Sequence, residues 1–130
     1  MRRAIASAEA GHPSGVDRVE SDLLGTLIIC PFLRLDCEAL KPGDFKSPFR
    51  GAAFAAIMAV KHPELALVAA HLEAVGEPAP PSRTGWVDAL SRVVDNTFLE
   101  EDAVRDAIRV IRDAAVSRRL ATIMGRQDAA

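Results

Sequence analysis

Residues 100–124 read E-E-D-A-V-R-D-A-I-R-V-I-R-D-A-A-V-S-R-R-L-A-T-I-M, and this stretch decides the fold. Thr97 stands three residues before Glu100, which is the T-x-x-E spacing of a capping box at the start of a helix. Acidic residues fill the first turn, and Arg118 and Arg119 lie in the last, so both ends match the sign of the helix dipole. We therefore expect one long C-terminal helix here.

The apolar side chains of this helix change sides halfway along it. At 3.6 residues per turn, four of them fall within about 60° of one another: Val104, Ile108, Ile111 and Ala115. Val116, Leu120 and Ile123 cluster roughly 120° away, on the side that arginines occupy in the first half. We expect the first half to close the core and the second half to meet a partner or a segment outside this chain.

A second helix is predicted from Asp17, a good N-cap residue, to about Ile29. Its apolar residues cover nearly the whole circumference, so it should be the central and most buried element. Pro31 then opens a short helical segment that the turn residues K-P-G-D-F end. Ser47 and Pro48 are the N-cap and first-turn proline of the next helix.

Further short helices complete the predicted head. Pro63 precedes a helix that Gly76 closes as its C-terminal cap. Residues 76–84, G-E-P-A-P-P-S-R-T, form the clearest loop, and Trp86 begins a short amphipathic helix after it. The prediction is an all-α fold: a compact helical head of about five to six helices with a long C-terminal helix.

Composition and charge agree with a single helical domain. The chain has 130 residues, 49 % of them hydrophobic and many of these alanine, with 5 % aromatics and no tyrosine. A net charge of -2 gives no strong electrostatic attraction to nucleic acid. No apolar run approaches the roughly 20 residues that cross a bilayer, and no secretory signal precedes the domain. We expect a cytoplasmic protein without a membrane partner.

No catalytic, cofactor or metal site is predicted. The sequence has no P-loop, and its three histidines share no metal-ligand spacing with each other or with the cysteines. Cys30 and Cys37 are seven residues apart, which suits reduced, mostly buried thiols rather than a C-x-x-C site. We therefore expect a non-enzymatic module that binds other proteins.

Several motifs, in order, resemble the N-terminal domain of the DnaB-type replicative DNA helicase. They are E-S-D-L-L-G-T-L-I (20–28), L-K-P-G-D-F (40–45), S-P-F-R-G-A-A-F-A-A-I (47–57), W-V-D-A-L (86–90) and I-R-D-A-A-V-S-R-R-L (111–120). The chain departs from that family at Arg50, where histidine is usual, at Ala107, where an aromatic is usual, and in its shorter 76–84 segment. The chain therefore resembles a divergent member of that family.

The resemblance covers residues 17–124, with 1–16 and 125–130 as tails. It implies a helical head that leads into a helical hairpin, of which the long helix is the first arm. In that family the domain pairs with other copies and recruits primase or a helicase loader, and it meets DNA only indirectly. The second arm and the ATPase motor are absent from these 130 residues.

The predicted interface has apolar anchors and a basic rim, because buried aromatic and aliphatic side chains supply most interface energy. The anchors are Trp86, Val116, Leu120 and Ile123, and the rim contacts are Arg118 and Arg119. For Trp86 the competing interpretation is core packing, and for the arginines it is a solvated helix end.

Two other functions remain open at this point. The helicase-binding domain of bacterial primase resembles the same helicase domain in architecture, and would bind helicase instead of primase. A small helical nucleic-acid-binding protein, using the basic end of the last helix, would show affinity that falls steeply with added salt.

Overall fold

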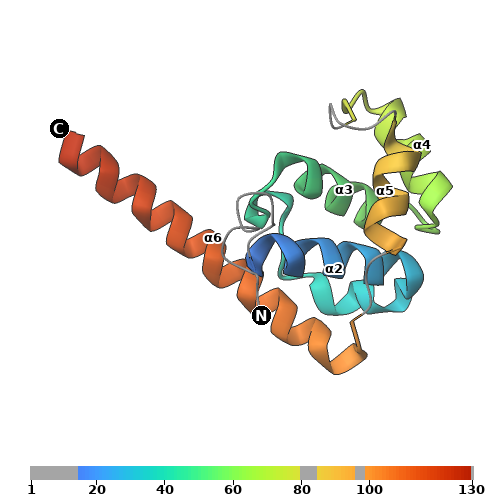
Figure 1. Cartoon of the computed structure of the whole chain (residues 1–130), viewed down its shortest axis with the longest axis horizontal. Coiled ribbons are helices and arrows are strands. Elements are labelled where there is room, and N and C mark those ends of the chain that lie inside the picture. The colour runs from blue at the N-terminus through green and yellow to red at the C-terminus, as the bar shows by residue number, and fades with distance from the viewer. Residues whose placement is uncertain (1–14, 80–84, 96–98, 130) are drawn as a thin grey trace, which may run out of the picture.

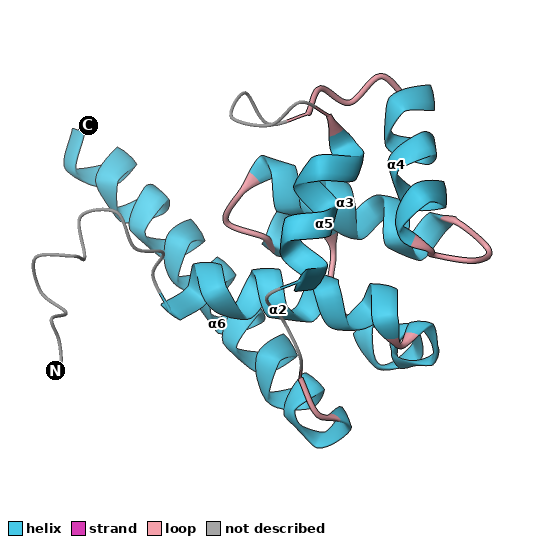
Figure 2. Cartoon of the chain, turned by 45° about the vertical axis from the view of Figure 1, so that its right-hand side comes forward, coloured by secondary structure: helices cyan, strands magenta, loops and turns pink. Residues whose placement is uncertain are grey.

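The computed structural model describes residues 15–79, 85–95 and 99–129, without the side chains of 126–129. Every regular element in these ranges is helical, and none is a strand (Figure 2). In chain order the elements are α2 (Gly15–Ile29), η2 (Pro31–Cys37), η3 (Pro42–Asp44), α3 (Pro48–Ala59), α4 (Leu65–Ala74), α5 (Trp86–Asp95) and α6 (Glu101–Ala129). The all-α prediction is confirmed. None of the described helices has the length and apolarity needed to cross a membrane.

Helix α2 is the centre of the head, as its apolar circumference predicts. It contacts η2, α3, α5 and α6, and Leu23, Leu24 and Leu27 are fully buried among them (Figure 1). The helix begins at Gly15, two residues before the expected start, so the prediction of Asp17 as N-cap is wrong. Asp17 lies instead in the first turn, where its carboxylate is near the positive end of the helix dipole.

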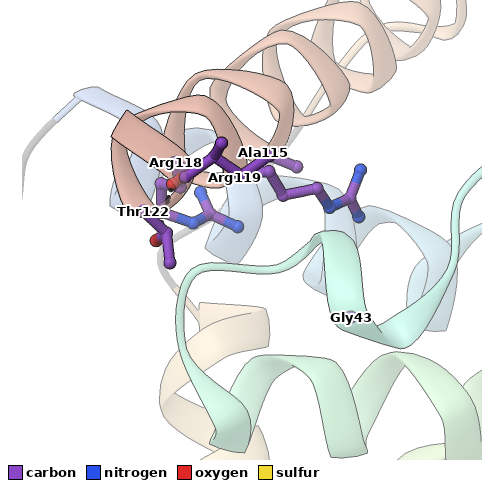
Figure 3. A pocket seen from close by; sticks show the side chains of 6 residues that line it. Gly43, Ala115, Arg118, Arg119 and Thr122 are labelled. Carbon is purple, nitrogen blue, oxygen red and sulfur yellow. Dashed lines mark hydrogen bonds between the residues drawn. The ribbon is translucent and has the colours of Figure 1, made fainter. Parts of the chain in front are cut away.

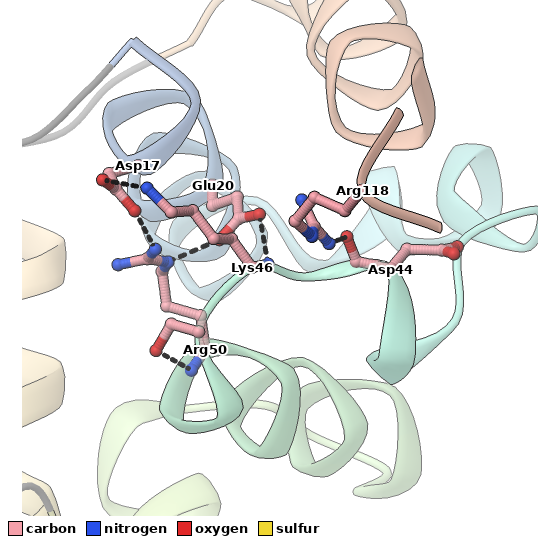
Figure 4. A network of polar contacts seen from close by, with 7 residues as sticks. Asp17, Glu20, Asp44, Lys46, Arg50 and Arg118 are labelled. Carbon is pink, nitrogen blue, oxygen red and sulfur yellow. Dashed lines mark hydrogen bonds and ion pairs between the residues drawn. The ribbon is translucent and has the colours of Figure 1, made fainter. Parts of the chain in front are cut away.

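A buried ion pair joins α2 to α3. Glu20 is completely buried, and its carboxylate accepts hydrogen bonds from Arg50 Nε at 2.6 Å and from the Lys46 backbone N–H at 2.7 Å (Figure 4). Arg50 also reaches Asp17, which Lys46 Nζ approaches at 3.2 Å. Both oxygens of the buried carboxylate are therefore satisfied, which a charge inside a helical core requires.

The segment after Pro31 is helical but of the tighter 3-10 type. Seven residues, Pro31–Cys37, form η2, and the K-P-G-D turn forms the single turn η3. Arg34 stabilises this region by donating from Nη1 to the carbonyl oxygens of Ile57 and Val60 at the end of α3. These are carbonyls that the helix itself leaves without partners.

After η3 the predicted starts of α3 and α5 are confirmed, whereas α6 runs to Ala129, so the prediction of Arg118 and Arg119 in its last turn is wrong. Ser47 Oγ accepts from the Arg50 backbone N–H, so Ser47 is the N-cap of α3. Helix α4 ends at Ala74, and Gly76 caps it two residues later, where its φ of 82° lets the Glu77 N–H reach the Leu72 carbonyl at 3.0 Å. The predicted capping residue Thr97 lies outside the described residues.

Candidate protein-interaction surface

Helix α6 has the two apolar faces that its sequence predicts. Its first half packs on the head through five buried side chains: Val104, Ala107, Ile108, Ile111 and Ala115. In its second half, Val116, Leu120 and Ile123 are 49 %, 55 % and 48 % exposed, and we call these three residues the α6 stripe. Large aliphatic side chains aligned at helical spacing and left half exposed are typical of a binding face.

The stripe lies where α6 leaves the head. Figure 1 shows α6 passing beneath α2 and then extending beyond the body of the molecule to the C-terminus. Its contacts with the rest of the chain are to α2, η2 and η3. A helix that projects in this way is accessible to another molecule along most of its circumference.

Two arginines hold α6 to the head just before it projects. Arg118 Nη2 donates to the Asp44 carbonyl oxygen at 2.8 Å (Figure 4). Arg119 Nη2 donates to Asp44 Oδ1 at 2.6 Å. The other carboxylate oxygen, Oδ2, accepts the Lys41 backbone N–H at 2.9 Å. We call Asp44, Arg118 and Arg119 the Asp44 clamp.

Asp44 is ionised in this setting. Burial alone would raise its pKa, but the hydrogen bond from Lys41 and the guanidinium of Arg119 outweigh burial and hold the pKa below its ordinary value. The nearby charge of Arg112 acts in the same direction. The clamp is therefore an intact ion pair at neutral pH.

Two hollows border α6 next to the clamp, and both are lined by Arg119. One, of about 360 Å³, is lined by Gly43, Ala115, Arg118, Arg119, Thr122 and Ile123 (Figure 3). The other, of about 330 Å³, is lined by Ala39, Lys41, Asp44, Arg112, Val116 and Arg119. Each hollow includes one residue of the α6 stripe, so a partner on the stripe has a basic recess beside it.

The structure does not place Trp86 with the other predicted anchors. Trp86 is buried at the start of α5, where its ring stacks on Phe49 with centroids 5.2 Å apart. Its Nε1 donates to the Glu77 carbonyl oxygen at 2.8 Å. The choice of Trp86 as a surface anchor is wrong, because both its apolar ring and its polar atom have partners inside the head.

Both cysteines lie at least partly inside the head. Cys37 is buried, and burial together with the charge of Asp36 raises its pKa to about 12. Cys30 is half-buried. Within the described residues, no three His, Cys, Asp or Glu side chains are grouped so that they could hold a metal ion.

Sequence reasoning missed the two acids that organise the polar contacts, Glu20 and Asp44. Asp44 sits in a turn motif, and its partners lie 74 and 75 residues away, so no local spacing indicates the contact. Glu20 offers a weak signal in the sequence. It stands four residues before the buried Leu24, so both side chains lie on the same face of α2 and the acid is expected to face the core.

No protein-family model, curated protein or solved structure matches this chain. The resemblance to the helicase domain therefore stays a prediction.

Proposed function

We propose that this chain is an interaction domain similar to the N-terminal domain of a replicative helicase. In this role it associates with further copies of itself and docks primase or a helicase loader, and it takes part in DNA replication as a non-catalytic scaffold. The observation that carries the proposal is the α6 stripe, three aligned aliphatic side chains half exposed on a projecting helix. The ordered motifs from Glu20 to Leu120 support the choice of family.

The position of the stripe supports a scaffold role. Burying an aliphatic side chain contributes about 1.5–3 kcal/mol relative to leaving it in water, so three such residues can dominate an interface. In the helicase family the corresponding helix is the first arm of a hairpin through which domains pair. The projecting half of α6 provides the surface that this pairing requires.

The first test is the solution mass, measured by light scattering over a range of concentrations. We expect the wild-type chain to form a dimer or larger assembly, and the double variant Leu120→Ser/Ile123→Ser to shift toward monomer. Leu67→Ser in α4 is the matched control, since Leu67 is 47 % exposed but lies away from α6. Equal masses for the wild type and the double variant at every concentration would contradict self-association through the stripe.

The second test separates the candidate partners. The chain is immobilised and challenged with replicative helicase, helicase loader and primase in separate binding experiments. Binding of primase or loader that Leu120→Ser/Ile123→Ser abolishes supports the proposal. Binding of helicase with no binding of primase would identify the chain as the helicase-binding domain of a primase instead.

A further inference from the structure

A second apolar surface lies on the head, at the junction of α2 and η2. Ile29, Phe32 and Leu35 are 47 %, 64 % and 75 % exposed, and we call them the Phe32 patch. Phe32 and Leu35 are three residues apart in a 3-10 helix, so their side chains lie on the same side. A phenylalanine and a leucine this exposed, side by side, are unusual for a surface that only faces water.

An acidic hollow borders the same 3-10 helix at Asp36. A recess of about 340 Å³ lies between η2 and the start of α6, lined by Asp36, Glu101, Asp102 and Arg105. Across the described residues, none of the three carboxylates has an ion-pair partner. A ligand for this region therefore needs an apolar surface with cationic side chains at its edge.

The α6 stripe has the complementary arrangement. The recess beside Val116 contains Lys41, Arg112 and Arg119, with Asp44 as its one acid. Asp44 pairs with Arg119, while Lys41 and Arg112 make no ion pair with any described side chain. The α6 stripe therefore has a cationic recess next to it, and the Phe32 patch has an acidic one. The two surfaces are complementary in charge.

Each of the two surfaces presents three exposed apolar side chains. From Val116 to Ile123 an α-helix rises about 10 Å at 1.5 Å per residue. From Phe32 to Leu35 the chain rises about 6 Å at the 2.0 Å per residue of a 3-10 helix, and Ile29 lies at the end of α2 just before it.

One copy cannot make this contact with itself. The acidic recess includes Glu101 and Asp102 at the first turn of α6, and Leu120 lies 19 residues after Glu101 on the same helix. At 1.5 Å per residue this places the two surfaces about 28 Å apart along a straight rod. An α6 stripe that covers the Phe32 patch must therefore come from another copy.

We propose that the α6 stripe of one copy docks on the Phe32 patch of the next copy, head to tail. This inference rests on the proposed self-association and names its partner surface. Because the two faces of such a contact differ, each bound pair still offers one free stripe and one free patch, and the assembly continues as a ring or an open chain.

Mixing two variants tests the proposal directly. Phe32→Ser/Leu35→Ser removes the patch, and Leu120→Ser/Ile123→Ser removes the stripe. All four side chains are half exposed or more, so circular dichroism should show unchanged helix content. We expect each variant alone to be monomeric and an equimolar mixture to form a one-to-one dimer, since the first still has a stripe and the second a patch.

The outcomes separate this inference from the proposed function. If the stripe variant dissociates while the patch variant assembles like the wild type, self-association stands and head-to-tail docking is overturned. If the wild type is monomeric at all concentrations, or if both variants assemble like it, both proposals are overturned. A one-to-one dimer that appears only in the mixture is expected from head-to-tail docking alone.

Charge reversal tests the two recesses. Asp102→Arg and Arg112→Asp should each weaken association of the full chain by about tenfold, because like charges then face one another. The chain that carries both changes should regain most of the lost affinity. If the association affinity of the double variant falls by the product of the two single losses, the two recesses do not face each other and the proposed pairing is wrong.

Discussion

At the scale of single residues, the buried carboxylate of Glu20 is the most sensitive group in the head. Glu20→Gln should lower the free energy of unfolding by about 2–4 kcal/mol, because Arg50 loses its buried charge partner. Urea unfolding measures this directly. Asp106→Asn is the control, since its pair with Arg109 is exposed and should contribute less than about 1 kcal/mol. If both variants lose the same free energy of unfolding, the buried Glu20–Arg50 pair stabilises the fold no more than an exposed pair does.

Asp44 makes stability depend on pH in a defined direction. Its folded-state pKa lies below the ordinary value of 3.8, so the carboxylate stabilises the fold at neutral pH. This contribution is lost as the pH falls below that ordinary value toward the folded-state pKa. The difference in unfolding free energy between the wild type and Asp44→Asn should therefore shrink as the pH falls from about 7 to about 3. A difference that stays constant over this range would contradict the lowered pKa.

The residues of the α6 stripe could be predicted from the sequence, whereas the Asp44 clamp could not. The positions of Val116, Leu120 and Ile123 follow from helical periodicity, which is a local property. The role of Arg118 and Arg119 depends on a turn more than 70 residues earlier in the chain. Trp86 illustrates a different error: an aromatic after a polar loop has the same sequence signal whether its ring faces the core or the solvent.

At the scale of helices, the contact between α3 and η3 depends on one glycine. A Cβ at position 51 would lie 2.6 Å from the Pro42 carbonyl oxygen, so Gly51→Ala must push the two elements apart. We expect a loss of about 1–3 kcal/mol in urea unfolding, although alanine normally favours a helix. Gly125→Ala in α6 is the control, because no atom lies within 4 Å of the added Cβ. A stabilising effect of Gly51→Ala would show that the approach of η3 is not tight.

Most helix boundaries were predictable because their signals are local. Ser47 with Pro48 and the glycine at position 76 mark ends that depend only on neighbouring backbone groups. The sequence does not distinguish the 3-10 geometry of η2 from an α-helix, since packing on α2 and the reach of Arg34 to α3 decide it. The start of α2 was misplaced by two residues because Asp17 is used for ion pairs rather than as a cap.

At the scale of the whole molecule, the two halves of α6 should differ in local stability. The first half is part of the core, while the second half has its exposed stripe in solvent. Hydrogen exchange of the dilute chain should show rapid exchange for amides 120–125 and strong protection for those of Leu24 and Leu27. Raising the protein concentration should slow exchange in residues 120–125 and leave α2 unchanged. Equal protection at both concentrations would argue against assembly through this half.

The Asp44 clamp also has a geometric consequence. Arg118 and Arg119 lie about 100° apart around the helix axis and both reach the same residue, so α6 cannot roll about its own axis without breaking one contact. The clamp thus sets the azimuth at which the stripe leaves the head. In a head-to-tail assembly the same angle recurs at every contact between copies, so small changes in the angle accumulate along the assembly. A single aspartate would then determine the curvature of the assembly, and with it whether the series closes on itself or winds into a spiral.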